Sequence, residues 1–185
     1  MKHLGTVRLE TERLILRRCR IEDAEASYKN WTSDEKVTKF LTWPTHSDVN
    51  VTKMILSDWA NSYEKPDYYQ WLIELKEISE PIGSIAAVKV DDDLKKVEIG
   101  YCIGSKWWHR GIMTEAFSAV IGFFFREVGM NRIEARHDIN NPHSGAVMKK
   151  CGLQLEGTHR QADRNNQGIV DVCVYGILAA DYFRK

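Results

Sequence analysis

The chain has 185 residues, 43% of them hydrophobic and 28% charged, which is ordinary for a globular protein and predicts a single domain over residues 1–185. Its 26 Lys and Arg residues balance 26 Asp and Glu residues, which excludes a nucleic-acid binder that depends on overall positive charge but leaves a local basic patch open. The N-terminus has no apolar signal segment and the longest apolar stretch, 116–125, is too short to span a bilayer, so we expect a cytoplasmic protein that does not bind membranes.

Segments in which every second residue is apolar predict strands, and segments with apolar residues three or four positions apart predict helices. In chain order, the first half predicts a strand at 13–18, helices at 21–30, 33–40 and 47–63, and strands at 69–75 and 84–90. The second half predicts a strand at 97–103, a helix at 113–128, a strand at 132–137, a helix at 144–151, and strands at 153–160 and 169–178 around the polar loop 162–168. This order is typical of a mixed α/β sheet.

The run EIGYCIGSKWWHRGIMTE, residues 98–115, is the most informative segment. A predicted strand ends near Ile103 and a helix opens near Ile112, with a loop that contains two basic side chains and Gly111 between them. The N-terminus of a helix has backbone N–H groups without partners, and its dipole favours negative charge. Because glycine lets the backbone approach a ligand closely, this loop is a candidate phosphate-binding site.

Together with the element order, this loop resembles the pyrophosphate loop of the GCN5-related N-acetyltransferase (GNAT) superfamily, Gln/Arg-x-x-Gly-x-Gly/Ala. Here the loop runs from Trp108 to Met113, and these two end positions depart from the pattern. An aromatic residue at the first position is similar to the branch of ribosomal-protein (RimJ/RimL-type) acetyltransferases. Two further motifs resemble that branch: ETERLILR at 10–17, and Asn141-Pro142-His143-Ser144 followed by VMKKCGL at 147–153.

The resemblance covers nearly the whole chain and implies an α+β fold, with a mixed, mostly antiparallel, twisted sheet of about seven strands flanked by about four helices. It implies transfer of an acetyl group from acetyl-CoA to a primary amine. The acceptor would be a protein N-terminal amine or a small amine such as a polyamine, amino acid or aminoglycoside. The expected coenzyme A contacts are Tyr101, Cys102, Ile103, His109, Arg110, Gly111, Ile112, Met113, Thr114, Asn141 and Ser144.

Two residues are candidates for catalysis by the same resemblance. Glu98 lies on the strand that leads into the loop and would be the general base; the alternative is a surface glutamate paired with Lys95 or Lys96. Many relatives have a tyrosine acid where this chain has Met148, so Ser144 would hydrogen-bond the departing sulfur. The alternative for Ser144 is a helix cap.

Other classes of function are weighed against this one. An acyl-CoA-binding or sensing module of the same fold, without turnover, would explain the missing tyrosine and Met113. An unrelated nucleotide-binding site would require a lysine after the glycine loop or a second glycine, and neither is present. No metal is expected, because His137 and His143 lack carboxylates at ligand spacing and the four cysteines share no metal-binding spacing. The sequence leaves the oligomeric state open, and a homodimer is one of the alternatives.

Overall fold

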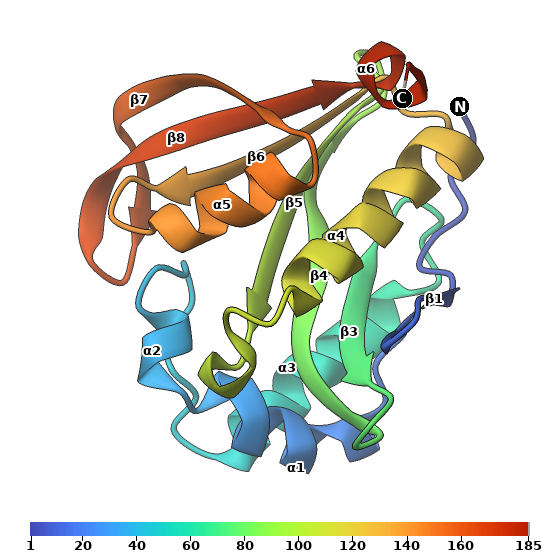
Figure 1. Ribbon diagram of the computed structural model, residues 1–185. Helices are drawn as coiled ribbons and strands as arrows, with labels where there is room; N and C mark the ends of the chain where they lie inside the picture. The colour runs from blue at the N-terminus through green and yellow to red at the C-terminus, as the bar shows by residue number, and fades with distance from the viewer. Residues whose placement is uncertain (185) are drawn as a thin grey trace.

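The computed structural model describes residues 1–184, which form a twisted eight-stranded sheet with helices on both faces (Figure 1). The strand order is β1-β2-β3-β4-β5-β6-β8-β7, and every neighbouring pair is antiparallel except β5 and β6. The strands are β1 (Leu9–Glu10), β2 (Leu14–Arg17), β3 (Gln70–Leu75), β4 (Glu80–Asp91), β5 (Lys96–Ile103), β6 (Arg132–Asp138), β7 (Gln154–Asn165) and β8 (Gly168–Leu178).

The helices connect these strands and vary in length. A continuous helical segment runs through a 3₁₀ turn (Ile21–Asp23), α1 (Ala24–Ser27) and a π-helical turn (Tyr28–Thr32). The other helices are α2 (Glu35–Thr38), α3 (Val49–Ser62), α4 (Ile112–Phe123) with a π-helical end (Phe124–Val128), α5 (Pro142–Lys150) and α6 (Ala179–Phe183), and a 3₁₀ turn (Ser105–Trp107) precedes α4. In the part of the chain that the structure describes, no helix has both the length and the hydrophobicity that crossing a bilayer requires.

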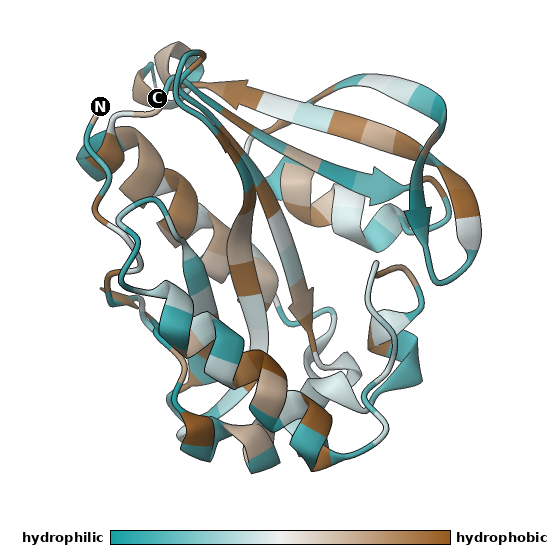
Figure 2. Ribbon diagram, turned by 180° about the vertical axis from the view of Figure 1, so that it is seen from behind, coloured by the Kyte–Doolittle hydropathy of each residue, from teal (hydrophilic) through white to brown (hydrophobic). Residues whose placement is uncertain are grey.

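The sheet is buried on both faces, so the core has two parts. Because side chains alternate along a strand, neighbouring residues of β3 face opposite layers. Trp71 belongs to the larger cluster, which includes α4 residues such as Phe117, whereas Leu72 belongs to a smaller cluster with Trp31 and Leu56. Figure 2 shows hydrophobic bands along the central strands and hydrophilic residues on the outer turns of the helices. This two-sided burial explains why β3 is an almost continuous apolar run.

The sheet and the mixed α/β order are confirmed, but the count and some boundaries differ from the expectation. An eighth strand, β1, forms where Leu9 and Glu10 pair with Leu16 and Ile15; two residues are too few for a period-two pattern to detect. The polar loop expected at 162–168 is mostly strand, because β7 continues to Asn165 and pairs with β8 across a tight turn. The α-helices number six within residues 1–184: α6 was not predicted, and α2 is shorter than the helix expected at 33–40.

The parallel pair β5 and β6 shapes the centre of the sheet. Their pairing covers three positions, the last of which joins Glu98 and Glu134. Beyond this point β5 continues to Ile103 and β6 to Asp138 without a shared ladder, and Figure 1 shows the two strands diverging. The gap opens at the carboxyl ends of both strands, which lead to α4 and α5.

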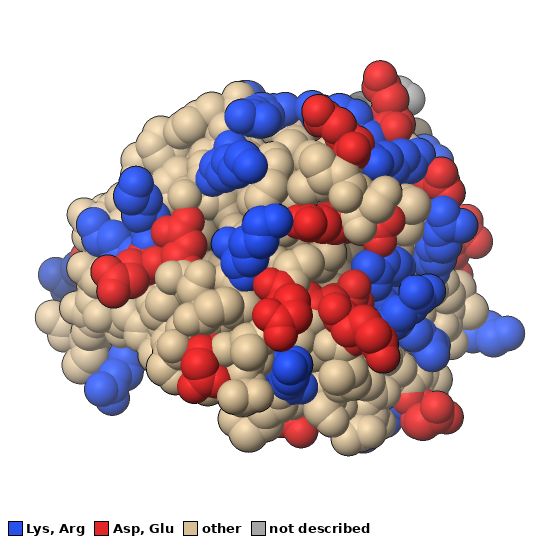
Figure 3. Space-filling model, turned by 90° about the horizontal axis from the view of Figure 1, so that it is seen from below, with Lys and Arg blue, Asp and Glu red and all other residues tan. Residues whose placement is uncertain are grey.

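Opposite charges are interspersed on the face that carries α1 and α3, as Figure 3 shows. Lys53 of α3 approaches Glu25 of α1 within 3.5 Å, and the half-buried Arg17 pairs with Asp23 at 2.7 Å. The exposed Lys53–Glu25 pair contributes at most about 1 kcal/mol. On this face, positive and negative side chains therefore alternate and no large patch of a single charge forms.

The packing of α5 against β6 depends on Gly145. A Cβ atom at this position would lie 2.5 Å from Nε2 of His137. The His137 ring is buried, and its Nδ1 is 2.8 Å from the carbonyl oxygen of Asp138, so it has little freedom to move aside. The glycine thus sets the distance between the helix and the sheet.

We predict that Gly145→Ala destabilises the protein although alanine favours helices by about 1 kcal/mol. The clash with His137 should lower the free energy of unfolding by about 1–2 kcal/mol net, measured by urea denaturation. Gly157→Ala is the control, because no atom lies within 4 Å of a Cβ there. Equal stability of the two variants would contradict the close packing.

Candidate functional site

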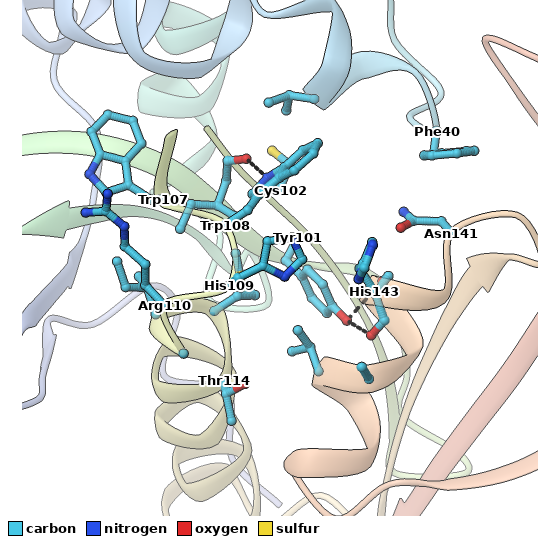
Figure 4. Close-up of a pocket in the computed structure, with 18 of the residues that line it drawn as sticks. Phe40, Tyr101, Cys102, Trp107, Trp108, His109, Arg110, Thr114, Asn141 and His143 are labelled. Carbon is cyan, nitrogen blue, oxygen red and sulfur yellow. Dashed lines mark hydrogen bonds between the residues drawn. The ribbon is translucent and has the colours of Figure 1, made fainter. Parts of the chain in front are cut away.

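A cavity of about 330 Å³ lies where α2, the end of β5, α4 and α5 meet. Residues 101–103 of β5, the first turn of α4 and one side of α5 line it, together with Asn140 and Asn141, which follow β6. Figure 4 shows Arg110 toward one end of the cavity, and Phe40 and Asn141 toward the other. Its lining includes every residue that we expected to contact coenzyme A: Tyr101, Cys102, Ile103, His109, Arg110, Gly111, Ile112, Met113, Thr114, Asn141 and Ser144.

The loop before α4 has a backbone suited to an anion. Gly111 is the N-cap residue of α4 with φ of +73°, and no side chain caps the helix. His109 also has a positive φ, +61°, which is uncommon for a residue with a side chain. The first N–H groups of a helix have no intrahelical acceptor, and Ile112, Met113 and Thr114 all line the cavity. The loop therefore presents unpaired donors at the positive end of a helix dipole.

Glu115 fastens this loop to the turn between β1 and β2. Its carboxylate accepts hydrogen bonds from Oγ1 of Thr11 at 2.6 Å, and from the backbone N and Nε of Arg13 at 2.9 and 2.7 Å. Arg13 also donates through Nη1 to the carbonyl oxygen of Arg110 at 3.0 Å. Burial by itself raises the pKa of Glu115, but the bonds from Thr11 and Arg13 outweigh it and hold the pKa below its ordinary value.

Two tryptophans brace the other side of the loop. Trp107 is buried, and Trp108 donates from Nε1 to the carbonyl oxygen of Ile103 at 2.9 Å. The 3₁₀ turn is tied to α2, because the backbone N–H of Ser105 donates to the Asp34 carboxylate at 3.4 Å. The departure from the family pattern at Trp108 thus adds a contact that closes the loop onto its own strand.

Tyr101 and Ser144 join β5 to α5 inside the cavity. The Tyr101 hydroxyl donates to the backbone carbonyl of Ser144 at 3.0 Å, and the Ser144 hydroxyl donates to the Tyr101 oxygen at 3.1 Å (Figure 4). Burial raises the pKa of Tyr101, so the phenol is protonated at neutral pH. Ser144 does not cap α5, since the N-cap residue is Asn141 and no side chain caps that helix; the capping alternative is therefore wrong.

Glu98 does not line the cavity. Its side chain, 13% exposed, pairs with Nη2 of Arg136 at 2.7 Å. The alternative partners considered from the sequence, Lys95 and Lys96, were wrong because the parallel register places Glu98 beside β6. Lys96 instead pairs with Glu134 at 3.3 Å.

The cavity has a positive lining. It contains Lys36, Arg110 and Lys150 together with His109 and His143, whose rings meet edge-to-face with centroids 4.8 Å apart. Of the residues that the structure describes around the cavity, none is Asp or Glu. Across residues 1–184, no three His, Cys, Asp or Glu side chains gather as a metal site would require.

Several contributors to the site were missed in the sequence. Thr11, Arg13 and Glu115 lie in motifs that the sequence drew attention to, but nothing local indicated that these motifs touch. The wall formed by Lys36, Val37, Phe40 and Leu41 lies in a segment predicted only as helix. The only local sign of this wall in the sequence was that apolar residues continue to Leu41, past the end of the helix predicted at 33–40.

Comparison with known proteins decides which family has this arrangement. A family model described as the acetyltransferase (GNAT) domain matches residues 13–154. The chain belongs to the GNAT family. YoaA of Bacillus subtilis (strain 168), described as an uncharacterized N-acetyltransferase, is 32% identical to it over 170 residues, which are 92% of this chain and 96% of the relative.

Two further GNAT comparisons involve proteins that act on ribosomal proteins. The ribosomal-protein-serine acetyltransferase of Escherichia coli (strain K12) is 30% identical over 108 residues, 58% of this chain and 60% of that protein. The solved structure of RimL, a ribosomal L7/L12 alpha-N-protein acetyltransferase in complex with coenzyme A, has a TM-score of 0.82 at 20% identity, and the match covers 93% of this chain and 98% of that one. At this identity the likeness shows the shared fold.

This GNAT protein is an acetyl-CoA-dependent N-acetyltransferase. The residues present fit the cofactor: the uncapped α4 N-terminus and Arg110 suit a pyrophosphate, and the cavity continues past Tyr101 toward Asn141. Acetyl-CoA supplies the activated acetyl group. The chain supplies backbone donors, a protonated hydroxyl pair and the walls of the cavity.

We predict that Glu115→Gln weakens the loop anchor. A group whose folded-state pKa is lowered adds stability that is complete above its ordinary pKa of 4.5 and is lost as the pH falls through the folded-state value. At pH 7 the variant should therefore be less stable by about 1–3 kcal/mol, and the difference should vanish in acid. Urea denaturation across pH measures this, with exposed Glu127→Gln as the control; a pH-independent difference would contradict the role of the charge.

Proposed function

We propose that this enzyme acetylates the α-amine of a peptide or protein N-terminus. The observation that carries the proposal is the lining of the cavity, which is basic and contains no carboxylate among the described residues. Two consequences follow from it, one for the proton that the amine must lose and one for the charge of the acceptor. Both favour an α-amine over the polyamines and aminoglycosides that the sequence left open.

An amine attacks only when it is neutral, and the cost of neutralising it depends on its pKa. Taking about 8 for an α-amine and about 10.4 for a lysine-type amine, deprotonation at pH 7 costs roughly 1.4 and 4.6 kcal/mol. A strong general base would be needed near the thioester for the second class. Because no Asp or Glu among the described residues lines the cavity, the first class suits this site better.

The charge of the cavity points the same way. Lys36, Arg110 and Lys150 line it, and none of them is in an ion pair among the described residues. Coenzyme A phosphates would neutralise those near the α4 loop, but Lys36 lies on α2, at the other wall. A polycation would meet this charge unfavourably, whereas an N-terminus has a single amine. The relatives named for ribosomal-protein acetylation agree with this class.

Direct attack of the amine on the acetyl carbon is the proposed route. The cavity contains one thiol among the described residues, Cys102, and burial raises its pKa to about 11. The thiol is therefore protonated at neutral pH, and only the thiolate is an effective nucleophile. This supports transfer without an acetyl-cysteine intermediate.

The leaving thiolate needs a proton or a hydrogen bond, and the Tyr101–Ser144 pair is placed to provide one. The Ser144 hydroxyl donates to the Tyr101 oxygen. To hydrogen-bond the departing sulfur, this hydroxyl would rotate away from the phenol. Glu98 remains our proposed base, but it lies outside the cavity lining and pairs with Arg136. It would act through intervening water. A base at this distance suffices for an α-amine because little free energy is needed to deprotonate such an amine at pH 7.

The first test is a panel of amines assayed for thiol release from acetyl-CoA. We expect short peptides with a free N-terminal serine or alanine to be acetylated, and spermidine and kanamycin to react at least tenfold more slowly. An N-acetylated version of the best peptide is the control for background hydrolysis. A preference for spermidine or kanamycin would refute the α-amine class. Coenzyme A binding without thiol release for any amine would refute turnover and favour a sensing module.

The second test addresses the two catalytic candidates. Ser144→Ala should lower kcat about tenfold or more with a small change in the KM for acetyl-CoA, measured with the best peptide. Glu98→Gln should lower kcat/KM, whereas the matched Glu134→Gln, which alters the paired position on β6, should not. An unchanged kcat/KM for Glu98→Gln would remove that residue from the mechanism, and full activity of Ser144→Ala would do the same for the serine.

A further inference from the structure

We infer that Asn166 is a positioning residue that holds the acceptor wall of the cavity in place; the inference rests on the proposed function. Asn166 is in the turn between β7 and β8, outside the pyrophosphate loop and outside the cavity lining. Figure 1 shows the β7–β8 turn close to α2. The contacts between these two distant segments carry the inference.

The acceptor wall, residues 36–41, begins in α2 and continues into an irregular loop. Four of its residues line the cavity: Lys36, Val37, Phe40 and Leu41. After α2 ends at Thr38, the chain has no regular structure until α3. The hydroxyl groups of Thr38 and Thr45 meet at 2.5 Å and close the loop 38–45 at its base. The wall thus belongs to a small closed loop with little secondary structure of its own.

Asn166 uses all three of its donors on this loop. Its backbone N–H donates to the carbonyl oxygen of Leu41 at 3.1 Å. Its side-chain Nδ2 donates to the carbonyl oxygens of Thr38 and Trp43, each at 2.8 Å. A neutral side chain with two N–H donors on one nitrogen can satisfy two carbonyl groups at once, and among short side chains asparagine alone provides this. The turn residue therefore connects the start, middle and end of the loop.

The neighbouring Asn165 fastens the same turn to the opposite wall. Its Nδ2 donates to Oδ2 of the buried Asp138 at 2.8 Å, and the other oxygen of Asp138 accepts from the backbone N–H of Asn140 at 2.8 Å. Asn140 and the adjacent Asn141 line the cavity. Consecutive asparagines thus bind the two sides of the cavity, and the turn sets the spacing between them.

The distance between these two walls should affect binding of the acceptor more than binding of acetyl-CoA. The pyrophosphate loop and Tyr101 are held by Glu115, Arg13 and Ser144, and none of these contacts involves the β7–β8 turn. Releasing Asn166 should loosen the wall around Phe40 and Leu41 and leave the coenzyme A half intact.

Hydrogen exchange and steady-state kinetics on the full chain test the inference. Asn166→Ala removes two hydrogen bonds, and the isosteric Asn166→Asp turns a carboxylate toward two carbonyl oxygens. Exchange of amides in the peptide 36–46 should rise about threefold to tenfold in the Ala variant and more in the Asp variant. The KM for the best N-terminal serine or alanine peptide should rise by a similar factor, while the KM for acetyl-CoA stays unchanged. Gln167→Ala is the matched control, because this exposed neighbour donates to Asn165 through its backbone N–H, which the substitution keeps.

Unchanged exchange in Asn166→Asp would overturn the inference, because the wall would then be held without the side chain. Faster exchange with an unaltered peptide KM would overturn it as well, since the contact would be structural only. Failure of every peptide in the panel is a separate result. It would refute the proposed acceptor, whereas the exchange measurement, which needs no acceptor, would still decide whether Asn166 holds the loop.

Discussion

The short parallel pairing of β5 and β6 is the constraint on which the rest of the site depends. A parallel pair needs a crossover, and here α4 makes it, so both carboxyl ends point the same way. Pairing stops after Glu98 and Glu134, and the strands then separate. The space between them cannot be filled by backbone hydrogen bonds within the sheet. Side chains such as Tyr101 and the helices that follow each strand surround it instead.

The chemistry follows from what this separation brings together. The N-termini of α4 and α5 both face the cavity, so positive helix ends and unpaired N–H groups converge there. The two nearby carboxylates do not face this cavity, because Glu115 pairs with Arg13 and Glu98 pairs with Arg136. An anionic cofactor and an amine that loses its proton easily are the reactants that such a site suits. Cofactor binding and the proposed acceptor class therefore have a common electrostatic basis.

Local patterns predicted the parts of the fold and site that depend on short segments. The loop around Gly111 was found because a strand, a glycine and a helix start lie within a few residues. The partners of Glu98 and Glu115 could not be found this way, since Arg136 and Arg13 are 38 and 102 residues distant. The end of β7 was missed for a similar reason: its polar residues are held in a strand by pairing with β8. Sequence patterns predict the individual helices and strands. Contacts between them depend on how the strands pair, which local patterns do not reveal.

The two halves of the cavity come from different parts of the chain, and this has an evolutionary consequence. The cofactor half is built largely from the contiguous stretch 101–150, whereas the acceptor wall comes from residues 36–41 and depends on a turn at 165–168. Changes in length or composition at that turn can remodel what the enzyme accepts while its donor site is preserved. One scaffold can thus diversify its acceptors through a surface hairpin that lies outside the cavity lining.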